Sequence, residues 1–189
     1  MEFVTWILLI VVGFGLYLVG LYNGLITLKN RVQEAVADIE VQLKRRYDLI
    51  PNLLETVKGY VKHEKETLQA VTEARTAAMK ISDVVAKGET ENQLSQTLKS
   101  LFAVSENYPD LKANQNFLEF QRELSDTENK VQASRRFYNG MVRDFNTKLQ
   151  VFPTNLFGQW LKFVEFKFFA LEAEERQAAT QAPKVKFDA

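Results

Sequence analysis

The sequence predicts an all-α protein in which an N-terminal transmembrane helix continues into an antiparallel bundle of about four helices. Three observations support this fold class. Residues Phe3–Leu28 carry no charged side chain. In the rest of the chain, apolar residues recur at steps of three or four, the spacing of one helix face. Only 8 Gly and 4 Pro occur in 189 residues, which favours long helices over a turn-rich β fold.

The first part of the uncharged stretch, Phe3–Tyr22, is almost continuously apolar. About 20 helical residues at ~1.5 Å each span ~30 Å, the thickness of a bilayer's hydrocarbon core. A cleaved signal peptide would need a basic start, a shorter apolar core and an Ala-x-Ala site, and a buried core helix is disfavoured by the length of the run. We therefore predict a transmembrane anchor at residues 1–22, in contact with the lipid bilayer.

Basic residues give the anchor a predicted orientation. No Lys or Arg precedes it, whereas Lys29 and Arg31 follow it closely. The positive-inside rule then puts the N-terminus outside and the bulk of the chain in the cytoplasm.

Residues 23–151 are expected to form the helical bundle, with helices at 23–49, 52–81, 91–107 and 114–150. Pro51 lacks an N–H and disfavours helix at the residue before it, so we interpret this site as a hairpin, with Asp48 capping the second helix. One long kinked helix through Pro51 is the alternative. The last helix carries a heptad seam with the small residues Thr127 and Ser134 in its middle.

The segment 152–170 is rich in aromatic residues and includes two lysines. Four alternating helices would return the chain to the membrane here, so this segment suits the membrane interface. The alternative is that the rings close the open end of the bundle or form a subunit contact. The candidate interface residues are Phe157, Trp160, Phe163, Phe166, Phe168 and Phe169. The remaining tail, 171–189, is charged and Ala-rich.

Composition disfavours several function classes. Lys and Arg together number 24, equal to Asp and Glu, so no basic excess points to nucleic acid. There is no Cys, and the single His63 lies in His-Glu-Lys-Glu, which is not a zinc motif. No glycine-rich phosphate loop occurs. We therefore predict no catalytic residue, no metal and no cofactor.

One dense polar cluster remains, formed by Arg45, Arg46, Tyr47 and Asp48, and the pair Arg135-Arg136 resembles it in composition. Arginine makes bidentate pairs well, so these residues could dock a partner protein or a neighbouring subunit. Alternatively, Arg45 or Arg46 pairs with acidic residues of the same bundle, such as Glu128 or Asp126, and sets helix register.

Several motifs, in order along nearly the whole chain, resemble the LemA family. The Gln42–Asn52 block is the most specific of them. The resemblance implies a bacterial, membrane-anchored helical bundle with an assembly or adaptor role, sometimes linked to a membrane protease, and it supplies no catalytic residue. Phe157–Phe169 is longer and richer in aromatics than the family pattern. The motifs are Tyr22-Asn23, Leu28–Arg31, Asp38, Gln42–Asn52, Thr56–Tyr60, His63-Glu64, Ala74-Arg75, Ser134–Asn139, Phe152–Asn155 and Pro183–Phe187.

Together these features predict a non-enzymatic scaffold that self-associates as a homo-oligomer, single-pass in the bacterial inner membrane. Heptads, surplus aromatic residues and the glycines of the span, Gly13, Gly15 and Gly20, motivate self-association. An adaptor or regulator of a membrane protease or sensor is the alternative function. An enzyme or ligand-binding module would need a pocket ringed by convergent polar groups.

Overall fold

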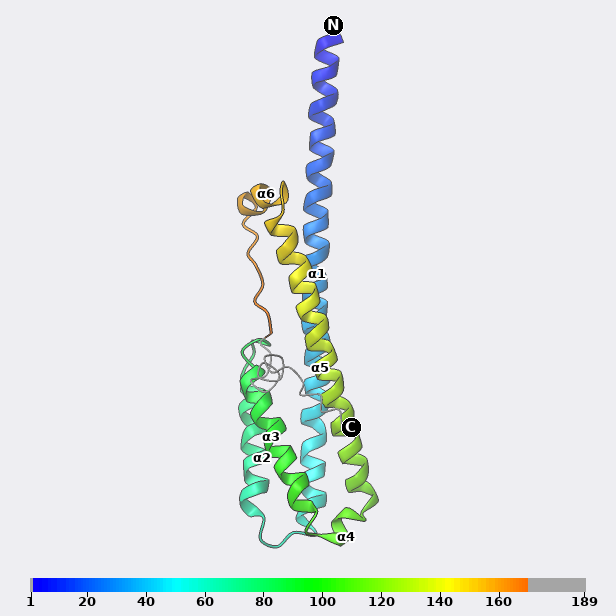
Figure 1. Cartoon of the computed structure of the whole chain (residues 1–189), viewed down its shortest axis with the longest axis vertical. Coiled ribbons are helices and arrows are strands. Elements are labelled where there is room, and N and C mark those ends of the chain that lie inside the picture. Colours follow the sequence, from blue (N-terminus) through cyan, green and yellow to red (C-terminus); the bar gives the residue numbers. More distant parts are fainter. Residues whose placement is uncertain (1, 170–189) are drawn as a thin grey trace, which may run out of the picture. The chain divides into compact units, whose positions relative to one another are not determined.

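A computed structural model describes residues 2–169, which contain helices and no strand. The predicted all-α class is confirmed, with a long apolar helix at the N-terminus (Figure 1). The predicted tail 171–189 lies outside the described residues. The helices are α1 Glu2–Lys58, α2 Lys65–Lys80, α3 Gly88–Ser105, α4 Pro109–Lys112, α5 Gln115–Gln150 and α6 Thr154–Trp160.

The described residues form two compact units. One unit comprises residues 2–46 and 126–168, and the other comprises residues 47–125 and 169.

In the first unit, α1 and the second half of α5 run side by side (Figure 1). The apolar stripes predicted for both helices face inward, because their members recur every three or four residues and so share one face. This burial confirms most of the predicted stripe and seam. The buried residues include Leu25, Val32, Ile39 and Leu43 from α1 and Val131, Tyr138 and Phe145 from α5.

After α6 the chain returns along α5 in extended form, as a segment that we call the strap, residues 163–168. The side chain of Asn146 holds its backbone at two points: Nδ2 donates to the Phe166 carbonyl at 2.9 Å, and Oδ1 accepts the Phe166 N–H at 3.0 Å. Tyr138 donates its hydroxyl to the Lys167 carbonyl at 2.9 Å. Phe163 and Phe166 pack edge-on against the ring of Phe145. Polar and aromatic contacts together fix the path of the strap.

The second unit joins the last turns of α1 to α2, α3, α4 and the first turns of α5. Helices α2 and α3 lie side by side (Figure 1). At the start of α5, Asn114 acts as an N-cap, since its Oδ1 accepts the Phe117 N–H at 3.0 Å. The core of this unit includes Leu53, Val57, Val71, Leu94, Leu101 and Phe117.

The predicted hairpin at Pro51 is wrong, because α1 continues through Pro51 to Lys58 and the turn lies at residues 59–64. A proline inside a helix leaves the carbonyl four residues earlier without its helical donor. Here that carbonyl belongs to Tyr47, and the Nε of Arg75 on α2 donates to it at 2.8 Å. A side chain from α2 thus replaces the missing bond. Asp48 is exposed within α1 and does not cap a helix.

Candidate membrane and partner-contact surfaces

The N-terminal half of α1 presents an apolar surface that the chain itself does not cover. Phe3 and Trp6 are 78% and 65% exposed, and Ile10 is 69% exposed. Within residues 2–169, α1 is the one helix long and apolar enough to cross a membrane, and none of its most apolar stretch is buried. A core helix of a water-soluble domain would bury such residues.

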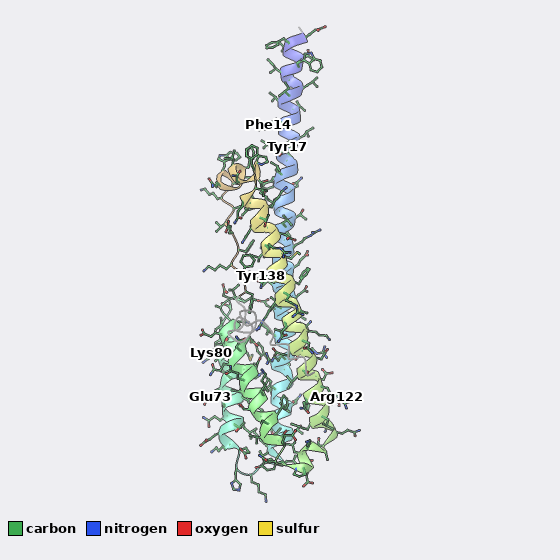
Figure 2. All side chains as sticks on the ribbon, in the orientation of Figure 1. Phe14, Tyr17, Glu73, Lys80, Arg122 and Tyr138 are labelled. Carbon is green, nitrogen blue, oxygen red and sulfur yellow. The ribbon has the colours of Figure 1, made fainter. Side chains whose placement is uncertain are left out.

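Helix α6 packs against this apolar part of α1. The rings of Phe14 and Phe157 lie 6.4 Å apart, and those of Tyr22 and Phe163 lie 6.3 Å apart. Figure 2 shows Phe14 and Tyr17 on α1 at the level of α6. Phe14 lies inside the apolar run and Tyr22 lies at its end, so α6 and the residues just after it meet α1 near the end of the candidate membrane span.

An apolar pocket of about 230 Å³ lies between these two helices. Leucines at three turns of α1 form one wall, and the end of α6 forms the other. Its main lining residues are Leu18, Leu21, Leu25, Phe157, Trp160 and Leu161.

The end of α6 has an unusual residue at its turn. The Phe163 N–H donates to the Gly158 carbonyl at 2.9 Å, and the Lys162 N–H donates to the Gln159 carbonyl at 3.1 Å. This pair of bonds is a Schellman motif, in which the residue after the C-cap is usually a glycine in the left-handed conformation. Lys162 occupies that position with φ of 58°, at a cost of about 1 kcal/mol or more.

The predicted membrane-interface residues have different environments in the structure. Phe157, Phe163 and Phe166 are half-buried, and Phe169 is buried with its ring against Gly88. Trp160 and Phe168 are 78% and 51% exposed. Part of the segment is therefore packed within the chain. For its exposed side chains, a role at the membrane interface stays a prediction.

The arginines of the polar cluster have different environments. Arg46 is buried, and its guanidinium pairs with Glu128 at 2.8 Å, which is the internal pairing that the sequence left open. Arg45, Asp48 and Arg136 are exposed, and Arg135 is half-buried. Within these two groups of residues, Arg45, Asp48 and Arg136 are therefore the side chains most accessible to a partner.

Asp126 lies one helical turn before Lys130 on α5, and the two side chains pair at 2.8 Å. The hydrogen bond from Lys130 holds the pKa of Asp126 below its ordinary value, and the charges of Lys130 and Arg45 add to this effect. Asp126 is thus an ordinary surface carboxylate in a basic neighbourhood.

A buried pair that was not predicted from the sequence joins Tyr47 to Glu91. Glu91 is fully buried, and the Tyr47 hydroxyl donates to its Oε1. The spacing contained a signal for this pair: Glu91 stands three residues before Leu94 and seven before Leu98, so it lies on the apolar face of α3.

A second pocket, of about 320 Å³, lies at the turn between α1 and α2 and is lined by Lys58, Lys62, Glu64 and Lys65 among others. Glu64 accepts a hydrogen bond from the Tyr108 hydroxyl at 3.2 Å. Burial, and secondly this carboxylate, raises the pKa of Tyr108. In the described part of the chain, no group of three His, Cys, Asp or Glu side chains could hold a metal ion.

The fold and these surfaces define an all-α protein with one exposed, apolar helix as a candidate membrane span. The sequence profile of the LemA family matches residues 35–187. Protein LemA of Metamycoplasma hominis is similar to this chain, with 31% identity over 175 residues that cover 92% of this chain and 80% of the relative. The chain belongs to the LemA family.

Proposed function

We propose that this protein is a non-enzymatic helical scaffold, anchored by α1 in the bacterial inner membrane and self-associating there. The chain is single-pass in this proposal, with its N-terminus outside and its helical units in the cytoplasm. The occurrence of a related Protein LemA in a mycoplasma supports the bacterial setting.

The observation that carries the proposal is the uncovered apolar surface of α1. Fourteen large apolar side chains between Phe3 and Tyr22 are exposed. At ~1.5–3 kcal/mol for each side chain removed from water, their burial in lipid yields roughly 20–40 kcal/mol. A gain of this size makes a membrane the favoured environment for this helix.

Self-association is supported by the glycines of α1. Apart from the neighbouring backbone of α1 itself, a Cβ atom placed at Gly13, Gly15, Gly20 or Gly24 would meet no atom of residues 2–169 within 4 Å. Gly20 and Gly24 are four residues apart, the spacing that lets two membrane helices approach closely. The heptad seam of α5, in contrast, is largely buried within the chain, so it supports self-association less than the sequence suggested.

Three measurements test the proposal on the full-length chain. Alkaline carbonate should leave the protein in the vesicle pellet, and protease added outside intact cells should spare the helical units. Mass measurement in mild detergent should give more than one chain per particle. Extraction by carbonate would refute the anchor, and a single chain per particle would refute self-association.

An adaptor role is favoured by a smaller observation, the exposed pair Arg136 and Phe137 on α5, of which Phe137 is 50% exposed. A cation beside an exposed ring suits a protein contact. Charge reversal at Arg136, with unchanged helicity, would release a co-purified membrane protein if this role holds. Arg46 is unsuitable for this test because its charge is paired inside the fold.

A further inference from the structure

We infer that the pocket between α1 and α6 binds one acyl chain of a membrane phospholipid, whose phosphate is contacted by Lys162. This inference rests on the proposed membrane anchorage and adds to it a specific lipid as a resident partner. We call the pocket the acyl slot.

The chemistry of the lining selects an apolar occupant. The slot is lined by side chains of leucine, valine and aromatic residues, including Leu18, Leu21 and Trp160. The lining side chains present no polar surface to the slot. Such a site does not order water well, because a bound water needs two or more hydrogen-bond partners. An unbranched hydrocarbon chain fits such a lining.

The position of the slot indicates that the hydrocarbon chain comes from the membrane. The wall formed by α1 extends directly from the exposed apolar run that begins at Phe3, so the slot opens onto the surface that faces lipid in the proposed orientation. Leu18, Leu21 and Leu25 lie where the ~30 Å span ends. An acyl chain of the neighbouring leaflet can therefore enter from the side without crossing water.

Lys162 is the charged residue next to the slot along the chain. It directly follows Leu161, a lining residue, and its side chain is exposed. Its left-handed backbone, at φ of 58°, favours glycine, yet the chain has lysine there. A cation at the membrane surface attracts the phosphate of a lipid headgroup, which is a reason for a charged residue to stand at this strained position.

The test measures lipid retained by the full-length protein. The protein is reconstituted into vesicles of phosphatidylethanolamine and phosphatidylglycerol, re-extracted in dodecyl maltoside and purified, and phospholipid phosphorus is counted per chain. Leu21→Phe fills the slot, and Leu16→Phe is its matched control on the exposed side of α1. Lys162→Gln removes the charge, and Lys167→Gln is its matched control.

We expect the wild type and both control variants to retain one phospholipid per chain. Leu21→Phe should lower retention about tenfold, because losing contact with two methylenes has roughly that effect. Lys162→Gln should lower it about fivefold, the effect of one cation at a membrane surface.

The folded path of α6 is checked separately. Because the chain contains no Cys, Tyr22→Cys with Phe163→Cys allows a cross-link that reports whether the start of the strap still lies beside α1 in each variant. An unchanged cross-link with reduced lipid supports the acyl slot.

Three outcomes would overturn the inference. Equal retention in Leu21→Phe and Leu16→Phe would mean that the lipid is bound only around the helix. Unchanged retention with a smaller particle in Leu21→Phe would mean that a second copy of the chain fills the slot. Lost cross-linking in Leu21→Phe, together with normal retention in Lys162→Gln, would mean that lipid loss reflects displacement of α6. Carbonate extraction of every variant would instead refute the anchorage itself.

Discussion

The hydrogen bond between Arg75 and the Tyr47 carbonyl explains how α1 passes Pro51, and it gives a quantitative prediction. The bond measures 2.8 Å and is partly buried. Arg75→Met keeps most of the side chain's apolar stem but removes the donor, so the carbonyl loses its partner. A hydrogen bond to a charged group is worth ~1.5–3 kcal/mol. We therefore expect Arg75→Met to destabilise the protein by about this amount.

Arg75→Met should reduce the stability of the protein much less when Pro51 is replaced by alanine. Residue 51 then has an N–H of its own, which can donate to Tyr47 as in a regular helix. Arg75→Met in the Pro51→Ala background should cost only about 0.5 kcal/mol, which leaves a coupling energy of roughly 1–2.5 kcal/mol between the two sites.

Thermal unfolding of the four proteins in mild detergent, followed by far-ultraviolet circular dichroism, measures this coupling. At ~2–4 °C per kcal/mol for a chain of this size, Arg75→Met should lower Tm by roughly 3–12 °C in the wild-type background. Arg122→Met is the control, since Arg122 is an exposed arginine of the same unit. Equal losses from Arg75→Met in both backgrounds would refute the reasoning.

The remaining predictions concern two charged pairs. Glu128→Gln should destabilise the fold by about 2–3 kcal/mol. This is less than the ~3–5 kcal/mol lost when a fully buried pair is broken, because the side chain of Arg46 is 3% exposed but that of Glu128 is 25% exposed. Unchanged thermal unfolding would contradict this prediction. Asp126→Asn should leave Tm almost unchanged, since its pair with Lys130 is about half exposed on both sides. NMR titration should show the pKa of Asp126 below its ordinary value and rising in Lys130→Gln, with a smaller rise in Arg45→Gln. The small stabilisation from this group is then present above the ordinary pKa of aspartate and is lost as the pH falls through the lowered value; an unshifted titration would disprove the pairing in solution.

The regular parts of the fold could be predicted because they depend on local spacing. Leu25, Val32, Ile39 and Leu43 repeat at helical steps and are buried as expected. The exposed apolar run before them followed from composition alone. These features need no knowledge of which distant residues meet.

The parts of the fold that the sequence did not decide depend on contacts between distant residues. A local reading of Pro51 favours a helix end, and the compensating Arg75 lies 24 residues further along the sequence. The sequence left two roles open for the aromatic segment, the membrane interface and packing within the chain, and its residues divide between two environments because Asn146 fixes the backbone at Phe166 and so directs some rings inward. Neither contact has a signature in the sequence near the residues that it affects.

The Arg45–Asp48 cluster shows that residue type alone does not decide which side chain of a candidate site is buried. Residue type correctly suggested that Glu128 could pair with an arginine, but the spacing did not decide between Arg45 and Arg46. Neighbouring residues on a helix point about 100° apart, so one is buried and the other is exposed.

The way in which Asn146 holds residue 166 limits how this region can diverge among relatives. Both hydrogen bonds of the Asn146 side chain go to main-chain atoms of residue 166, so they do not depend on the side chain at that position. The strap can therefore change in sequence and keep the same backbone path. Aspartate could not substitute at position 146, since a carboxylate has no proton to offer a carbonyl. We therefore expect an amide to persist there even in relatives whose strap has drifted beyond alignment.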